Sequence, residues 1–300
     1  MNCQIHLTQL DPTLGNLGVN LEMHLTAAQE AAAEGADCVL FSELSLTGYF
    51  LKDQTAEVAL RLDAPPLREL AELSKEVSIG AGFIERGDDG QLYNAYGFWE
   101  DGALLSIHRK VHLVTYGMFE EHRDLGAGSD FTPTESKHGR FLVLTCEDAW
   151  HMQGPLLGFH AGVDAILVPS ASPARGVTDE SGVLGSVQAW SRLLSSWALI
   201  TQTWVCHINR VGFEDGIGFG GGSRAFDPFG QEVAALEGLD TGALKVKLDS
   251  GALDRARVAL PLRRDDRPWI LARELSKRED AGGWRGAANE RSRPLWRTEH

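Results

Sequence analysis

The chain has 300 residues, of which 43% are hydrophobic, and a formal net charge of -14. This charge argues against nucleic acid as a partner, because such binding depends mainly on lysine and arginine side chains that neutralise phosphates. Residues 1–10 do not resemble a signal peptide and no apolar run approaches the roughly 18 residues of a membrane span, so we expect a cytoplasmic protein without membrane contacts.

The first part of the chain predicts a parallel strand–helix–strand unit. Residues 3–10 alternate as a strand does, residues 20–34 carry apolar side chains on one helical face, and residues 37–41 form a short buried strand. A crossover of this length joins parallel strands. Further elements are expected along the next stretch: a helix over 65–76, a strand over 78–84, a hairpin of 92–100 with 103–108, and a loop over 115–130.

The second part continues the alternation of strands and helices and then loses it. We expect these elements: a strand over 141–145, a helix from residue 154, a strand over 163–170, a helix over 183–197, an apolar run over 197–208, a hairpin around 227–230, and a strand over 241–248. From Asp249 onward no periodicity remains. We therefore predict one domain over residues 1–250 and a C-terminal extension over 251–300 that docks on the domain or on a dimer partner.

The four cysteines do not form a recognisable metal or disulfide pattern. They contain no C-x-x-C pair and have no histidine at metal-ligand spacing. Cys3, Cys38 and Cys206 lie in apolar strand-like runs, so we expect them to pack in the core. We predict no metal site.

Polar residues follow three of the predicted strands. Glu43 comes after the strand over 37–41, Lys110 after the second arm of the hairpin, and Cys146 after the strand over 141–145. Attack of a cysteine on a carbonyl needs a base, a cation for the developing oxyanion and a thiol whose proton can leave. The helix predicted from residue 154 would lower the thiol pKa. Each residue also has a purely structural interpretation, and spacing alone does not show that they converge.

Three segments of the sequence resemble the signature segments of the nitrilase, or carbon-nitrogen hydrolase, superfamily. They are residues 41–49 (FSELSLTGY), 108–113 (HRKVHL) and 144–150 (LTCEDAW), in the order and at the separations of that family. Residues 115–121 and 209–212 add to the resemblance, which covers about residues 3–248.

The resemblance implies a fold and a set of roles. The fold is a four-layer αββα sandwich that commonly forms a homodimer or a larger oligomer. Glu43 would be the general base, Lys110 the stabilising cation and Cys146 the nucleophile. Glu121 would position the substrate or the lysine, and the amide of Glu147 would share the oxyanion with Lys110. No metal or organic cofactor is required.

The implied activity is hydrolysis of a non-peptide C–N bond in a small amide, with release of ammonia or an amine. The context of Cys146 resembles the glutamine-hydrolysing branch attached to NAD synthetases, but no synthetase domain follows in this sequence. A stand-alone amidase, an N-carbamoyl amide hydrolase, a glutaminase that needs a partner, and an idle scaffold all stay open. The residues expected to bind substrate are Tyr49, Tyr116, Glu147, Ser170 and Arg175, although Arg175 also fits an exposed loop arginine.

Overall fold

The computed structural model describes residues 2–176 and 183–280. Its contacts divide the chain into two units, Met1–Leu260 and Pro261–His300. The described part of the second unit contains the helices α7 (Leu262–Asp265) and α8 (Pro268–Asp280), whereas residues 281–300 lie outside the described residues. A membrane crossing needs a long apolar helix, and the described ranges contain none.

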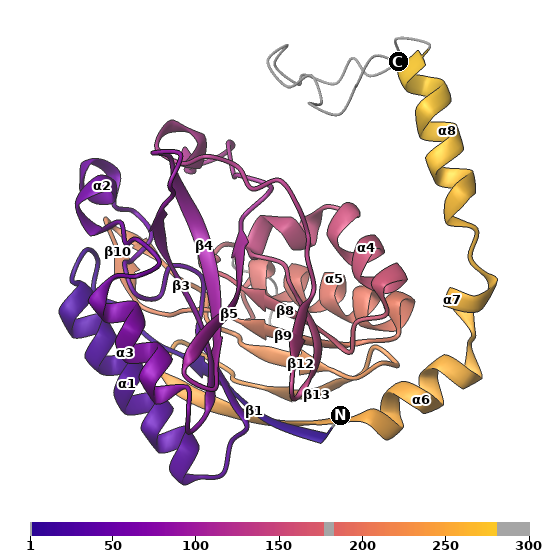
Figure 1. The fold of residues 1–300 in the computed structure, drawn as a ribbon, viewed down its shortest axis with the longest axis horizontal. Helices are drawn as coiled ribbons and strands as arrows, with labels where there is room; N and C mark the ends of the chain where they lie inside the picture. The colour runs from indigo at the N-terminus through magenta and orange to yellow at the C-terminus, as the bar shows by residue number, and fades with distance from the viewer. Residues whose placement is uncertain (1, 177–182, 281–300) are drawn as a thin grey trace. The chain divides into compact units, whose positions relative to one another are not determined.

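Two six-stranded sheets form the centre of the first unit (Figure 1). Their strand orders are β14-β1-β2-β3-β4-β5 and β13-β12-β9-β8-β7-β6, and in each sheet three adjacent strands are parallel and the others antiparallel. The first sheet contains β1 (Asn2–Gln9), β2 (Cys38–Leu40), β3 (Ser78–Arg86), β4 (Leu92–Glu100), β5 (Ala103–Arg109) and β14 (Gly242–Asp249). The second contains β6 (Thr134–Ser136), β7 (Gly139–Val143), β8 (Ala165–Pro169), β9 (Trp204–Ile208), β12 (Arg224–Phe226) and β13 (Glu232–Ala235). A small hairpin, β10 (Phe213–Glu214) with β11 (Ile217–Gly218), lies outside both sheets.

The apolar side chains of the central strands alternate between two cores. In β8, Ala165 and Leu167 belong to the core between the two sheets, which also contains Leu7 of β1. The intervening Ile166 and Val168 belong to a different core, on the outer face of the second sheet. Because both faces of these strands are covered, their sequences are continuous apolar runs rather than alternating ones.

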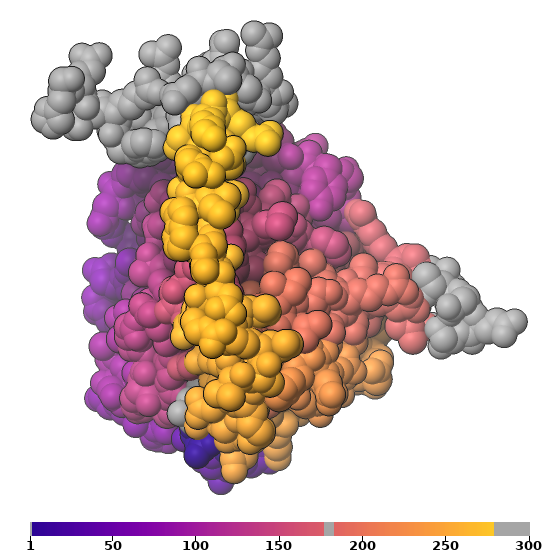
Figure 2. All heavy atoms as spheres, turned by 90° about the vertical axis from the view of Figure 1, so that its right-hand side faces the viewer, coloured from indigo at the N-terminus to yellow at the C-terminus, as the bar shows by residue number. Residues whose placement is uncertain are grey.

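Helices cover the outer face of each sheet. On the first sheet lie α1 (Leu17–Ala33) and α3 (Pro65–Leu73), and on the second lie α4 (Gln153–Ala161) and α5 (Gly185–Thr201) (Figure 1). In α1, Ala28 and Ala31 belong to the same core cluster as Ile79 of β3. Figure 2 shows the purple atoms of the first half and the salmon atoms of the α5 region on opposite sides. The first unit is therefore an αββα sandwich, which confirms the predicted fold.

Two segments differ from the expected elements. The helix predicted over 183–197 continues to Thr201, and the apolar run up to residue 208 is split between α5 and β9. Gln202 ends the helix with a left-handed φ of 55°. A run of apolar residues is compatible with a buried helix as well as with a strand, so its composition could not place this boundary.

The region after Asp249, where the sequence loses its periodicity, begins with the helix α6 (Ser250–Ala259). The Asp249 carboxylate caps this helix by accepting hydrogen bonds from the backbone amides of Gly251 and Ala252, both at 3.0 Å. Ala252 and Leu253 join the core between the sheets. This helix therefore belongs to the first unit, and the division of the chain falls after Leu260.

Candidate active site

Strand ends from both sheets contribute to one site. Glu43 follows β2 and Lys110 follows β5 in the first sheet, whereas Cys146 follows β7 in the second. The backbone amide of Ala171, just after β8, donates a hydrogen bond to Oε2 of Glu43 at 2.8 Å. This contact joins the two sheets at the edge where the parallel strands end, the usual place for chemistry in α/β proteins.

Two glycines allow the segments after β2 and β5 to lie close to their neighbours. A Cβ atom on Gly82 of β3 would lie 2.3 Å from the backbone nitrogen of Leu44. A Cβ atom on Gly128 would lie 2.0 Å from the carbonyl oxygen of Arg109, and the Gly128 amide donates to the carbonyl of Lys110 at 2.8 Å. Any side chain at these positions would push the polar segments away from the sheet.

A buried ion-pair network links Glu43, Lys110 and Glu121. Lys110 is fully buried, and its Nζ donates to Oε1 of Glu43 and to Oε1 of Glu121, both at 2.7 Å. Asn94 of β4 donates from Nδ2 to Oε1 of Glu43 at 2.7 Å, and the amide of Val114 donates to Oε2 of Glu121 at 2.9 Å. Buried charges need such pairing and hydrogen bonding. The network holds two carboxylates around one ammonium group.

The network shifts the pKa values of Glu43 and Lys110. Burial raises the pKa of Glu43, the nearby Glu121 carboxylate raises it further, and Lys110 opposes both effects. Burial alone would lower the pKa of Lys110, but the two carboxylates outweigh burial and raise it well above its usual value. Lys110 is therefore a permanent cation at neutral pH, and Glu43 is a stronger base than an exposed glutamate.

Cys146 begins the 3-10 turn η3 (Cys146–Trp150) with a φ of 48°. Left-handed backbone at a residue other than glycine costs about 1–3 kcal/mol and is concentrated at functional sites. Burial and the charge of Glu43 raise the pKa of the thiol well above its usual value, against the opposing effects of Lys110 and the Ala171 amide. The prediction of a lowered thiol pKa was wrong, because η3 lies before α4 and burial beside Glu43 dominates. These effects favour the protonated thiol.

Asp148 connects the Cys146 turn to the segment that follows β5. This fully buried carboxylate accepts hydrogen bonds from the amides of Val111 at 3.1 Å and His112 at 2.8 Å. His108 Nε2 and His112 Nδ1 lie 2.9 and 3.0 Å from its oxygens. Burial would raise the pKa of Asp148, but these partners hold it well below the usual range. Asp148 thereby fixes the position of Cys146 relative to Lys110.

Replacing Asp148 with asparagine should lower the free energy of unfolding at pH 7 by about 2–3 kcal/mol, since hydrogen bonds to a charged group contribute about 1.5–3 kcal/mol each. A carboxyl group whose pKa is lowered by folding stabilises the fold at pH values above its pKa in the unfolded chain, which is about 4. This contribution is lost as pH falls toward the pKa in the folded protein. The difference in unfolding free energy between the parent protein and the variant, measured in urea, should thus shrink below about pH 4. Asp130→Asn, at an exposed loop carboxylate, is the matched control. The unfolded pKa of an aspartate is ~3.9, so a difference in unfolding free energy that is equal at pH 7 and at pH 3.5 would contradict this account.

A cavity of about 420 Å³ opens beside Cys146. On its wall Glu147 accepts a hydrogen bond from the hydroxyl of Tyr116 at 3.0 Å. Burial and this contact raise the pKa of Tyr116 to about 12. The guanidinium of Arg175 also lines the cavity and lies 5.6 Å from the centre of the Phe119 ring. The cavity therefore offers an anion, a cation and aromatic surface next to the thiol.

The structure places most of the predicted substrate-binding residues on this cavity. Those that line it are Tyr49, Tyr116, Glu147 and Arg175. Ser170 is fully buried and is not part of the cavity wall. Ser172 takes that place, and its hydroxyl accepts a hydrogen bond from Nε1 of Trp190 at 2.8 Å. The chain leaves β8 at Pro169, so Ser170 still passes through the interior before the cavity wall begins at Ala171.

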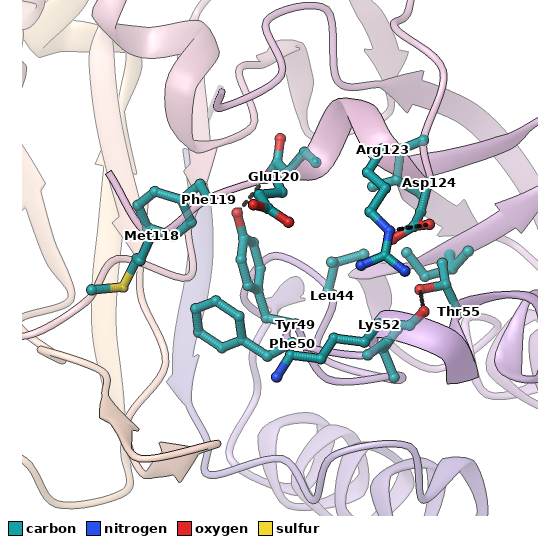
Figure 3. A pocket seen from close by; sticks show the side chains of 14 residues that line it. Leu44, Tyr49, Phe50, Lys52, Thr55, Met118, Phe119, Glu120, Arg123 and Asp124 are labelled. Atoms are coloured by element: carbon teal, nitrogen blue, oxygen red, sulfur yellow. Dashed lines mark hydrogen bonds and ion pairs between the residues drawn. The ribbon is translucent and has the colours of Figure 1, made fainter. Parts of the chain in front are cut away.

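Tyr49 and Phe119 separate this cavity from a smaller one of about 110 Å³. Figure 3 shows the smaller cavity with Phe50 and Met118 toward one end and Arg123 and Asp124 toward the other. The hydroxyl of Tyr49 donates to Oε1 of Glu121, so this wall is tied directly to the ion-pair network.

The segment of Tyr49 is anchored by the Asn209–Gly212 motif. Arg210 is fully buried and pairs with Glu214, whose Oε2 accepts hydrogen bonds from the amides of Tyr49 and Phe50, both at 2.9 Å. The Arg210 guanidinium also lies 4.0 Å from the centre of the Phe219 ring. This motif therefore acts on the site indirectly, through the loop that carries Tyr49.

Sequence reasoning missed several residues of the site. Asn94, which binds Glu43, is a polar residue within the apolar β4, and that interruption was a usable signal. Asp148 was visible only as part of the Cys146 segment. Trp150 and Trp190, whose ring centres lie 5.1 Å apart on the cavity wall, carry no sequence signal because tryptophans at such positions usually pack in cores.

Comparisons with known proteins agree on one family. The family model described as carbon-nitrogen hydrolase matches residues 4–258. The glutamine-dependent NAD(+) synthetase of Rhodobacter capsulatus is 30% identical over 259 residues, which are 84% of this chain but 44% of the relative. An (R)-stereoselective amidase of Pseudomonas sp. is 29% identical over 257 residues, 85% of this chain and 88% of the relative.

A solved structure extends the likeness to three dimensions. It is a mutant of the amidase from Nesterenkonia sp. AN1 that shows Michael addition of acrylamide at its active-site cysteine. It is 25% identical, has a TM-score of 0.70, and is covered over 98% of its length by 86% of this chain. The chain thus covers nearly the whole of this amidase but less than half of the synthetase.

The matched range of residues 4–258 begins in β1 and ends in α6, so it contains the whole sandwich. It also contains the strand ends that carry Glu43, Lys110 and Cys146. The chain belongs to the carbon-nitrogen hydrolase family.

Proposed function

We propose that the chain hydrolyses the C–N bond of a small amide through a thioester on Cys146 and releases ammonia or an amine. The observation that carries this proposal is the buried network of Glu43, Lys110 and Glu121, which acts electrostatically on a thiol at the wall of a cavity. The network supplies a base and a cation, and the cavity supplies room for a substrate.

The first half-reaction forms the thioester. Glu43 takes the proton of the Cys146 thiol while the sulfur attacks the amide carbon, and the oxygen becomes an oxyanion beside Lys110 and the amide of Glu147. An oriented donor of this kind contributes about 10²–10³-fold in rate. Glu43 then returns the proton to the leaving nitrogen as the C–N bond breaks. The raised pKa of Glu43 suits this exchange, because burial increases the proton affinity of the carboxylate.

The second half-reaction hydrolyses the thioester. Glu43, again ionised, takes a proton from water as the water oxygen attacks the carbonyl carbon. The C–S bond breaks, the carboxylic acid leaves, and Glu43 returns its proton to the sulfur, which restores the thiol and the carboxylate. Lys110 keeps its charge throughout, since two carboxylates raise its pKa.

The charges on the cavity wall favour a substrate with a charged head group. Glu147 suits a substrate ammonium group and Arg175 suits a carboxylate, so an ω-amide of an amino acid such as glutamine fits the pair. The volume of about 420 Å³ lies within the usual range for small-molecule sites. Relatives that are glutamine-dependent synthetases and amidases support the same class of substrate.

Ammonia release is the direct test. The purified chain is incubated with glutamine, asparagine, short aliphatic amides, ω-amido acids and N-carbamoyl amino acids, in parallel with Cys146→Ala. Release that requires Cys146 identifies both the mechanism and the substrate class. Release from none of these amides, together with ordinary thiol reactivity of Cys146, would overturn the proposal.

The two charged cavity residues should determine specificity rather than chemistry. Glu147→Gln and Arg175→Gln should each raise KM for glutamine by about 10–100-fold, since a charged hydrogen bond contributes about 1.5–3 kcal/mol. For an aliphatic amide, which has no charged head group, KM should change by less than about threefold. Steady-state kinetics on the two substrates checks this. Equal losses on both would show that these residues act on the chemistry or on folding instead.

A glutaminase that needs a partner is the second candidate. It is favoured by one observation, that the chain is 30% identical over 259 residues to a glutamine-dependent NAD(+) synthetase. Its signature is glutamine hydrolysis that is weak alone and rises when a separate ammonia-consuming synthetase is added. The same panel, repeated with such an enzyme, distinguishes the two candidates.

A further inference from the structure

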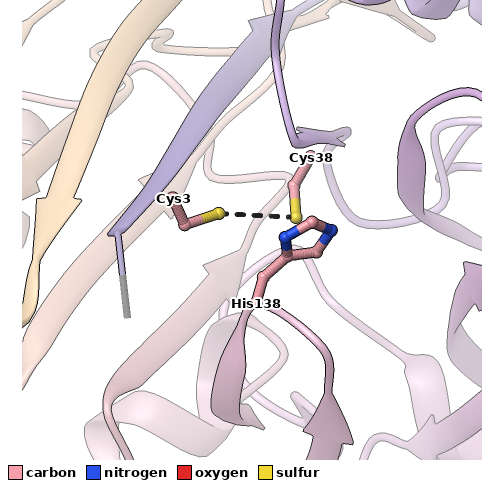
Figure 4. A group of neighbouring side chains, drawn as sticks. All are labelled: Cys3, Cys38 and His138. Atoms are coloured by element: carbon pink, nitrogen blue, oxygen red, sulfur yellow. Dashed lines mark hydrogen bonds between the residues drawn. The ribbon is translucent and has the colours of Figure 1, made fainter.

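Three potential metal ligands come together at a place remote from the candidate active site. Among the residues that the structure describes, the ligand atoms of Cys3, Cys38 and His138 all lie within 4.8 Å of one another (Figure 4). Cys3 lies near the start of β1, Cys38 is the first residue of β2, and His138 directly precedes β7. The candidate active site instead follows the ends of β2 and β7. The group therefore joins the two sheets at the opposite end of the same strands.

We propose that Cys3, Cys38 and His138 form a binding site for Zn²⁺, in which two thiolates and one imidazole leave a fourth position for water. Thiolate and imidazole are the preferred ligands of this ion. Zn²⁺ with two thiolates and a neutral imidazole carries no net charge, which suits a site whose two cysteines are fully buried. Binding would release the two thiol protons.

The spacing of the sulfur atoms fits this ion. Two sulfurs bound at about 2.3 Å to a tetrahedral centre lie about 3.8 Å apart. The observed distance between Sγ of Cys3 and Sγ of Cys38 is 3.7 Å. The imidazole nitrogen must approach by at most roughly 1 Å, since a bound nitrogen and sulfur lie about 3.6 Å apart.

The orientation of His138 supports the same assignment. Its Nε2 lies 3.2 Å from the hydroxyl of Ser78 and 3.8 Å from Oε2 of Glu100, which leaves Nδ1 for the sulfurs. Figure 4 shows a ring nitrogen directed toward Cys38. The hydroxyls of Ser78 and Ser136 donate to Oε2 of Glu100 at 3.2 and 2.6 Å and hold that carboxylate in place. A carboxylate behind a ligating histidine is typical of metal sites, where it orients the ring.

The histidine also provides access. Its side chain is 13% exposed, whereas the cysteines are fully buried, so an ion can enter from the His138 side. The sequence shows no spacing motif because the ligands come from segments far apart in the chain.

The test is metal binding by the full chain in a Cys146→Ala background, which removes the candidate nucleophile as a competing ligand. Reduced, metal-free protein is titrated with Zn²⁺ and, as a spectroscopic probe, with Co²⁺. About one equivalent of Zn²⁺ is expected to bind, and Co²⁺ should give near-ultraviolet sulfur-to-metal absorption. Adding Cys38→Ala should remove this absorption and weaken binding at least tenfold, as loss of a ligand does.

Two further variants control for folding. Cys206→Ala removes another fully buried thiol of the same core and should leave binding unchanged. His138→Gln changes a residue at the edge of the sandwich and should weaken binding at least tenfold without changing the circular dichroism spectrum. Absence of stoichiometric binding, or equal binding with and without Cys38, would overturn the proposal. Equal weakening by Cys206→Ala would do so as well. None of these readouts depends on amide hydrolysis.

Discussion

Replacing Cys146 with alanine is expected to lower amide hydrolysis by about 10⁴-fold or more while the protein stays folded, because loss of a catalytic nucleophile costs up to about 10⁶-fold. The same change should abolish labelling by acrylamide or iodoacetamide. Of the four thiols, Cys3, Cys38 and Cys206 are fully buried and Cys146 alone is partly exposed. Intact mass spectrometry should therefore find one adduct on the parent chain and none on the variant.

Cys206→Ala is the matched control for this experiment. It removes a fully buried thiol of the core between the two sheets, so labelling and hydrolysis should persist even though a core cavity lowers stability. Hydrolysis that survives Cys146→Ala would point to another nucleophile. If the parent chain is inactive and its Cys146 reacts no faster than an ordinary thiol at neutral pH, the chain is a scaffold rather than a hydrolase.

The order of strands and helices could be predicted from the sequence because two cores impose clear patterns. Strands buried on both faces give continuous apolar runs, as residues 163–170 do, and these runs placed β2, β7 and β8. Patterns failed for residues 197–208, because an apolar run fits either a helix or a strand. They also failed for α6, because this helix is too short and too charged to show a clear apolar face. The stacking of the two sheets came from the resemblance, since periodicity within a strand does not say what covers it.

The candidate site was predictable in its members but not in its electrostatics. Glu43, Lys110 and Cys146 follow predicted strands, so topology could bring them to one edge. The direction of the thiol pKa shift depends on burial and on how near Glu43 lies, neither of which a sequence displays. Asn94 is a different case: its polar side chain in the apolar β4 was a usable signal, but its partner, Glu43, follows β2 on the other side of β3.

The ion-pair network itself predicts that Lys110→Met damages both activity and stability. Loss of the oriented cation should lower kcat by about 10²–10³-fold. It also leaves Glu43 and Glu121 buried side by side without their shared partner, and breaking a buried ion pair typically costs about 3–5 kcal/mol. Unfolding by urea at pH 8 should show the loss of stability, and steady-state hydrolysis should show the loss in kcat.

The stability loss in Lys110→Met should depend on pH with a definite sign. Burial already raises the pKa of Glu43, and removal of Lys110 takes away the main effect that opposes this rise. A carboxyl whose folded pKa lies above its unfolded value destabilises the fold when it is ionised, so the deficit should be largest at pH 8 and shrink as pH falls toward about 5. The double variant Lys110→Met/Glu121→Gln removes one of the two charges and should recover stability without recovering activity. A deficit that is equal at both pH values, or that the second substitution leaves unchanged, would show that Lys110 stabilises the fold by packing rather than by its charge.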